Sequence, residues 1–138
     1  MSCTFCRIVA GDLGKTLLDE DEQCLVILDR NQAARGHMLV IPKLHVMLWH
    51  ELDPAVVAEM AAKAHVWARA LVDALHPDGY NVLINNGVAA GQDVSHVHVH
   101  ITPRSTGDRY YEFGGGHRVL SGAEAAALGA ELMRHRPR

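Results

Sequence analysis

The chain has 138 residues, of which 49% are hydrophobic and 21% are charged. These values are typical of one soluble globular domain with a single core, and two independent domains are not expected. The formal net charge is -3 and no block of basic residues occurs, so a polymeric nucleic acid has no electrostatic support as a partner. A small anionic ligand is compatible with this charge, because binding one requires local hydrogen-bond donors.

No apolar run approaches the roughly 20 residues of a membrane helix, and residues 1–6 lack the basic and apolar regions of a signal peptide. We therefore expect a cytoplasmic protein that binds no membrane. The three cysteines are an odd number, which argues against a disulfide framework. Cys3 and Cys6 form a C-x-x-C pair, whereas Cys24 lies in an apolar stretch and is expected to be a buried small hydrophobe.

The first half of the chain predicts two strands and a long helix. Two β-favouring runs, Cys24 to Asp29 and His37 to Ile41, flank a polar segment, as two strands and their loop would. Asp53 and Pro54 then offer an N-cap followed by proline at the first helical position. Apolar residues recur after them with the 3.6-residue helical period as far as a turn at residues 76–79.

After that turn, residues 80–85 and 94–102 are predicted to be strands joined by a glycine-containing loop. One long helix between two pairs of strands indicates an α+β fold. Composition shifts near Asp108, and we assign residues 1–108 to the main body of the domain. Residues 109–138 are expected to belong to the same domain, with a glycine-rich segment at Gly114-Gly115-Gly116, a short helix from Ser121 to about Met133, and a frayed basic end.

Histidine alternates with aliphatic residues in His96-Val97-His98-Val99-His100-Ile101. In a strand, this period of two places three imidazoles on one face, with successive Cα atoms about 6.6 Å apart, and the aliphatic residues on the core side. Imidazoles on such a face can titrate, bind metal or attack a substrate near neutral pH. Two interpretations follow: a metal cluster made by the three rings, or a nucleophilic histidine between two that position an anion.

The preceding segment, residues 85–92, contains glycines that allow close backbone approach and amides that can donate hydrogen bonds to phosphate oxygens. A loop of this kind leading into a histidine-rich strand favours anion chemistry. Taken alone, it is more typical of an ordinary turn.

Residues 96–102 resemble the histidine triad (HIT) motif, His-φ-His-φ-His-φ-φ, in which φ is hydrophobic. Asn85 and Gly91-Gln92 stand at matching distances before it, and residues 37–45 resemble the strand that ends in Pro-Lys-x-His in this family. The resemblance covers most of residues 3–108. It implies an α+β HIT fold, with an antiparallel sheet of about five strands and one long helix, usually as a homodimer, and a HIT-type hydrolase or nucleotidyl transferase.

The resemblance implies that His98 attacks the α-phosphorus of a nucleotide and forms a covalent nucleotidyl-histidine, which water hydrolyses. The attacking ring must be neutral, with the proton of its other nitrogen held by a backbone carbonyl that the family places near the last histidine. His100 would contact phosphate oxygens, while Gln92 and Asn85 would donate to the phosphate and its neighbourhood. The implied catalytic residues are His98, His100, His96 and Gln92.

A nucleotide site is implied as well. Asp29 follows the first strand, where related proteins place an acid against the ribose hydroxyls, although a turn residue bonding its own backbone is equally consistent. Ile27 and its aliphatic neighbours can wall the base pocket or belong to the core. The residues expected to bind the nucleotide, an adenine or guanine nucleoside phosphate, are Asp29, Asn85, Gly91, Gln92, Asp93, His98, His100 and Ile27.

Asp93 departs from those family members that carry serine or threonine at this position, where a hydroxyl can reach the leaving group. Its carboxylate brings negative charge near an anionic substrate unless it is turned away or protonated. The resemblance leaves two substrate classes open. Residues 103–108 with Tyr110 and Tyr111 resemble the dinucleoside polyphosphate branch, whereas the short chain and the C-x-x-C pair suit the branch acting on nucleoside phosphoramidates and aminoacyl-adenylate-like compounds.

Bacterial HIT-like proteins with an N-terminal C-x-x-C can bind zinc between the two thiolates and two histidines. The matching ligands here are Cys3, Cys6, His45 and His96. Two sulfurs and two nitrogens make a closed, structural tetrahedral site with no position for substrate, and we expect no catalytic metal. The alternative is that the two N-terminal cysteines are merely a mobile pair.

Two other functions remain open. A metal-dependent hydrolase would use the three histidines as ligands around an open water site, and chelation would then abolish activity. A nucleotide-binding sensor or interaction protein with negligible turnover would carry the same binding residues.

Overall fold

The computed structural model describes residues 3–108 and 118–138. The glycine-rich segment 114–116 and the two tyrosines, Tyr110 and Tyr111, lie outside these ranges. Five strands form one antiparallel sheet in the order β1-β2-β4-β6-β5. They are β1 (Thr16–Glu20), β2 (Cys24–Leu28), β4 (Met38–Pro42), β5 (Gly79–Leu83) and β6 (Val99–Arg104). The predicted α+β fold with five antiparallel strands is confirmed.

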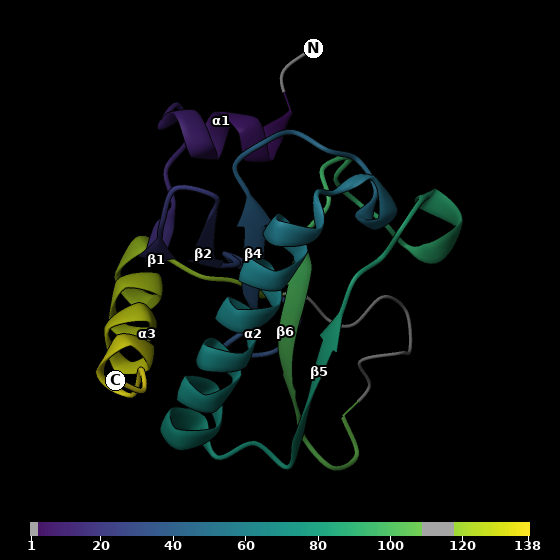
Figure 1. Ribbon diagram of the computed structural model, residues 1–138. Helices are drawn as coiled ribbons and strands as arrows, with labels where there is room; N and C mark the ends of the chain where they lie inside the picture. The colour runs from purple at the N-terminus through teal and green to yellow at the C-terminus, as the bar shows by residue number, and fades with distance from the viewer. Residues whose placement is uncertain (1–2, 109–117) are drawn as a thin grey trace.

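Three helices surround this sheet (Figure 1). The long helix α2 (Pro54–Leu75) lies across one face of the sheet, and α3 (Gly122–Arg134) lies beside α2 and β1. The short helix α1 (Thr4–Ala10) packs against the opposite face. A second, two-stranded sheet pairs β3 (Asn31–Gln32) with β7 (Arg118–Val119). Among the described residues, no helix is both long and apolar enough to cross a membrane.

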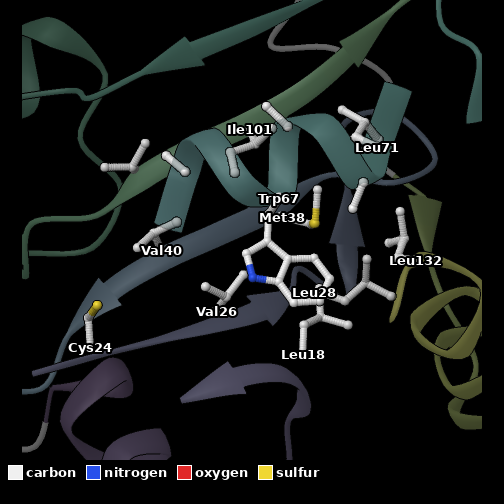
Figure 2. Packing of buried hydrophobic residues seen from close by; sticks show 14 of the residues in the cluster. Leu18, Cys24, Val26, Leu28, Met38, Val40, Trp67, Leu71, Ile101 and Leu132 are labelled. Atoms are coloured by element: carbon white, nitrogen blue, oxygen red, sulfur yellow. The ribbon is translucent and has the colours of Figure 1, made fainter. Parts of the chain in front are cut away.

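Strands β2 and β4 are buried at every position because both of their faces are covered. In β2, Val26 and Leu28 point to the α2 side, whereas Leu25 and Ile27 point to the α1 side. Trp67 of α2 is fully buried in the core on the α2 side, where it packs among aliphatic side chains of the sheet (Figure 2). Burial on both faces explains why these strands read as continuous apolar runs rather than as alternating ones.

Helix α2 follows the sequence signals closely. The Asp53 carboxylate accepts a hydrogen bond from the backbone N–H of Ala55 at 2.8 Å, and Pro54 fills the first helical position. At the other end, His76 adopts a left-handed conformation, with φ of 47°, and ends the helix. Helix α3 begins as predicted, since Ser121 and Glu124 form a reciprocal capping box.

The structure differs from the predicted elements in two respects. Helix α1 and strand β1 were not predicted, because neither short segment has a clear apolar period. Strand β6 begins at Val99 rather than at Val94, since the N–H of Val97 donates to the carbonyl of Val46 at 2.8 Å, outside the sheet. Within the basic end, the Arg136 guanidinium lies over Trp67, 5.6 Å from the ring centre.

Asp19 joins β1, α2 and the C-terminal end of the chain. A register shift in β1 is the kind of bulge that turns a side chain toward a new direction, and the Asp19 carboxylate faces α2. Its Oδ2 accepts hydrogen bonds from Trp67 at 3.0 Å and Lys63 at 3.2 Å, and pairs with Arg136 at 3.1 Å. Burial disfavours ionisation, but these donors outweigh it and lower the pKa of Asp19 below its usual range.

We expect the Asp19→Asn variant to be less stable than the wild type by about 1–2 kcal/mol at neutral pH, because the carboxylate is buried against two cations. A carboxyl with a lowered folded-state pKa stabilises above the unfolded pKa, near 3.8, and loses this effect as pH falls through the folded value. Urea unfolding at pH 7 and at pH 2.5–4 measures the difference, which should shrink on acidification. A stability difference between wild type and variant that did not change with pH would contradict an ionic role for Asp19.

Candidate active site

The three motif histidines lie on the α1 side of the sheet, while Val97, Val99 and Ile101 belong to the core on the α2 side. The predicted alternation therefore holds even though only His100 lies within β6. All three rings are buried, with exposed fractions of 0%, 2% and 8% for His96, His98 and His100. Their ring nitrogens do not converge, since His96 belongs to a cysteine cluster and the other two face a cavity.

His98 is held in the tautomer that a nucleophile requires. Its Nδ1 donates a hydrogen bond to the backbone carbonyl of His96 at 2.8 Å, which in the neutral ring leaves the lone pair on Nε2. This acceptor belongs to the first motif histidine, which corrects the expectation of a carbonyl near the last one. The ring of Phe5 meets His98 edge-on, 4.8 Å between centroids. The imidazole is therefore fixed on two sides, with Nε2 directed toward the cavity.

Asp93 lies beside Nε2 of His98. Its Oδ1 is 3.4 Å from Nε2 of His98, and its side chain is 71% exposed. The interaction with the adjacent His98 ring is the main cause that lowers the pKa of Asp93 to about 2, so the carboxyl is ionised at neutral pH. A negative charge thus occupies the position from which a phosphoryl group would approach.

His37 is a site residue that the sequence interpretation missed. Its Nε2 lies 2.9 Å from Nδ1 of His100, and its Nδ1 lies 3.6 Å from Oδ2 of Asp29. His100 retains a buried Nε2 with no hydrogen-bond partner among the described residues. Burial, together with the neighbouring His98, lowers the pKa of His100 to about 4, so this ring is neutral at pH 7. The alternation of His100 with apolar residues gave no sign of this pair, because strand pairing creates it.

Asp29 makes the turn contact that one interpretation of its sequence position predicts, and it also lines the main cavity. Its Oδ1 accepts a hydrogen bond from the N–H of Asn31 at 3.0 Å, as a turn residue does. Its Oδ2 meanwhile faces His37, and the residue lines the main cavity.

Gln92 lies away from that cavity. Its Oε1 accepts from the N–H of Gly87 at 2.7 Å, and its Nε2 donates to the carbonyls of Met47 at 2.9 Å and Val94 at 3.0 Å. The side chain therefore fixes the loop that carries Asn85 and Asp93, and a direct contact with phosphate stays a prediction.

One cavity of about 580 Å³ brings most of the predicted nucleotide-binding residues together, a volume in the range of small-ligand sites. Two basic residues that the sequence interpretation did not single out, Lys15 and Arg30, also line it. Apolar side chains from α1 and the sheet, among them Phe5 and Leu39, form another part of the wall. Of the predicted residues, the lining includes Ile27, Asp29, Asn85, Gly91, Asp93, His98 and His100.

The four predicted zinc ligands form a separate cluster. Nδ1 of His96 lies 3.4 Å from the sulfur of Cys3, 3.6 Å from that of Cys6 and 3.2 Å from Nδ1 of His45, and the Cys6 sulfur is 3.3 Å from Nδ1 of His45. Ligands placed 2.0–2.3 Å from a tetrahedral zinc ion are separated by about 3.3–3.8 Å. Nε2 of His96 contacts the carbonyl of Pro42 at 2.7 Å, as the outer nitrogen of a metal-bound histidine commonly does. This geometry is compatible with zinc.

Comparison with known proteins agrees with this arrangement. The family model described as the HIT domain matches residues 11–107. This chain belongs to the HIT family. Among solved structures, a zinc-bound histidine triad family protein from Mycobacterium smegmatis is 41% identical, with a TM-score of 0.82 over 98% of this chain and 93% of that one. A histidine triad nucleotide-binding protein from Sulfolobus tokodaii is 32% identical, with a TM-score of 0.86 over 96% and 91% of the two chains.

Two curated HIT relatives carry names that state an activity. An adenosine 5'-monophosphoramidase, hnt1 of Schizosaccharomyces pombe, is 39% identical over 96% of each chain. The adenylylsulfatase HINT3 of Arabidopsis thaliana is 46% identical over 77% of this chain, which spans only 54% of that relative's length. Both names state activities of those two relatives on adenosine or adenylyl compounds.

The Gln92→Ala variant should be destabilised by about 1–3 kcal/mol, because it leaves the N–H of Gly87 and two carbonyls without their partner. Faster hydrogen exchange at the Gly87 amide should accompany the loss of stability. Gln23→Ala, which truncates an exposed glutamine, serves as the matched control. Unchanged exchange at Gly87 in the Gln92 variant would show that the side chain does not hold the loop.

Proposed function

We propose that this protein hydrolyses, or transfers, the nucleotidyl group of a small nucleotide through a covalent intermediate on His98. The orientation of the His98 ring is the observation that carries the proposal. Its Nδ1 proton is committed to the His96 carbonyl, and its Nε2 faces a cavity of nucleotide size. A fixed neutral imidazole is a competent nucleophile, and covalent catalysis divides one difficult displacement into two easier steps.

In the first step, the Nε2 lone pair forms a bond to the α-phosphorus while the bond to the leaving group breaks, and the leaving group takes up a proton from solvent. In the second step, water attacks the same phosphorus and loses a proton to solvent while the P–N bond to His98 breaks, which restores the Nε2 lone pair and releases a nucleoside monophosphate. His100 can donate from Nε2 to a phosphoryl oxygen when its Nδ1 accepts from His37. Donors fixed where negative charge develops stabilise the transition state.

Two further predicted residues would contact a nucleotide in this cavity. Asp29 would accept hydrogen bonds from the ribose hydroxyls, and Ile27 would contact the base. Lys15 and Arg30 supply positive charge at the cavity wall. Adenosine 5'-phosphoramidates are the first substrates to test, because the relative named for that activity matches nearly the whole length of this chain. Dinucleoside polyphosphates are the second class.

The same cavity would serve a nucleotide sensor without turnover, and removal of the nucleophile separates the two functions. We expect His98→Ala to lower kcat by at least about 10³-fold, while the affinity for AMP changes by only a few fold. The reaction should be quenched without acid and the protein analysed by intact mass. A nucleotide adduct is expected in the wild type and should be absent from His98→Ala.

The exposed His65 on α2 offers a matched control, and His65→Ala should retain both the adduct and the turnover. Wild-type rates in the His98 variant would overturn the assignment of the nucleophile. Binding without turnover in the wild type would favour the sensor.

We also propose that Cys3, Cys6, His45 and His96 hold a structural zinc ion. All four ligand positions come from the protein, so the ion would supply cross-linking rather than chemistry to the substrate. It would join α1 to the segment that carries His98. A homodimeric state and a cytoplasmic location remain predictions, as does the single-domain assignment of residues 1–138, which the packing of α3 against β1 and α2 supports.

Replacing both Cys3 and Cys6 by alanine should remove about one zinc ion per chain and lower the melting temperature, because metal binding to such a site is coupled to folding. Elemental analysis and thermal unfolding measure the two effects. Cys24→Ala removes a thiol that is buried in the core, so it should lower the melting temperature and leave the zinc content unchanged. Equal zinc in the double variant and the wild type would refute the site.

A further inference from the structure

A second group of potential metal ligands lies in the proposed active site, apart from the cysteine cluster. A carboxylate oxygen of Asp93 and one ring nitrogen each of His98 and His100 lie within 4.8 Å of one another. Oδ1 of Asp93 and Nε2 of His98 are 3.4 Å apart. Two ligands bound about 2.1 Å from a tetrahedral ion have nearly this separation.

The outer nitrogens of both rings already have the partners that metal-bound histidines use. Nδ1 of His98 donates to the His96 carbonyl at 2.8 Å, and Nδ1 of His100 lies 2.9 Å from Nε2 of His37. When His100 donates its Nδ1 proton to His37, its buried and unpartnered Nε2 carries a lone pair. Contacts of this kind fix the tautomer and orientation of ligating rings.

We propose that Asp93, His98 and His100 form a second, three-ligand site for a divalent transition metal, with Zn²⁺ as the fitting ion, and that its occupancy inhibits the enzyme. Two imidazoles and one carboxylate suit zinc and its neighbours better than magnesium or calcium, which prefer all-oxygen sites. The binding claim rests on this geometry alone. The inhibition claim rests on the proposed function, because the ion would occupy the Nε2 lone pair that attacks phosphorus.

The two metal sites should differ in strength and in access. The cysteine cluster supplies four ligands, including two thiolates, whereas the active-site group supplies three ligands and one of them is exposed. The first site should therefore fill before the second as zinc is added. The second site should also compete with a nucleotide, since both use the space at Nε2 of His98.

Binding can be tested on the whole protein by equilibrium dialysis against buffered Zn²⁺, with elemental analysis of zinc per chain. We expect a second, weaker zinc ion in the wild type, and a loss of at least tenfold in its affinity in Asp93→Asn. Asp73→Asn, which changes an exposed aspartate on α2, should bind both ions as the wild type does. A second zinc ion bound equally well by the Asp93 variant would overturn the site.

Substitution with Co²⁺ distinguishes the two sites spectroscopically. Thiolate ligands give charge-transfer absorption in the near ultraviolet, whereas a site of nitrogen and oxygen ligands gives only visible bands. The second equivalent of Co²⁺ should add visible absorption without charge transfer in the wild type and should not do so in Asp93→Asn. Charge-transfer absorption from both equivalents would place the second ion at the cysteines and refute the proposal.

An activity assay with an adenosine 5'-phosphoramidate separates the two claims. Zinc added beyond the first equivalent should raise the apparent KM of the wild type, and Asp93→Asn should need at least tenfold more zinc for the same effect. Activation by the second ion would overturn inhibition and indicate a catalytic metal. Absence of turnover in metal-free wild type and in all variants would refute the proposed function, while the dialysis result would still decide the binding site.

Discussion

The hydrogen bond from Nδ1 of His98 to the carbonyl of His96 is the contact on which the site depends. His96 is itself fixed twice, through Nε2 to the carbonyl of Pro42 at the end of β4 and through Nδ1 to the cysteine cluster. A displacement of its backbone would move the acceptor that selects the tautomer of His98. The N-terminal helix, the cysteine cluster and the proposed nucleophile are thus one connected structure, even though the cluster touches no part of the cavity where Nε2 points.

The sheet can hold this connected structure because its two faces carry different side chains. On the α2 face, β2, β4 and β6 contribute apolar side chains to a core centred on Trp67 (Figure 2). On the α1 face, the same strands carry a smaller apolar cluster that includes Leu25, Ile27, Leu39 and Ile41, and the histidines continue that face. Phe5 of α1 packs against His96 and His98, so an apolar helix covers polar rings. Burial there restricts the rings and lowers the pKa of His100.

Local patterns were sufficient to predict α2, β2 and β4, since each has a long apolar period or run and a clear terminating residue. They were insufficient for α1, which has only seven residues, and for the start of β6, which depends on a hydrogen bond to Val46 far away in sequence. The triad and the zinc ligands were predictable because the motif encodes them. His37 and Lys15 were not, because only tertiary packing brings them to the cavity.

The exposed Asp93 carboxylate places a negative charge where the proposed reaction would bring an anionic phosphoryl group. An ionised carboxylate lies 3.4 Å from Nε2 of His98, the nitrogen that would attack phosphorus in the proposed mechanism. A phosphoryl group bound at reacting distance would lie within a few ångströms of the same charge, and at an effective dielectric constant near 20 their repulsion amounts to a few kcal/mol. In the proposed mechanism, an outward rotation of the carboxylate would relieve this repulsion, and the 71% exposure of the Asp93 side chain leaves room for such a rotation. The position of Asp93 would therefore set an electrostatic cost on the approach of an anionic substrate to His98.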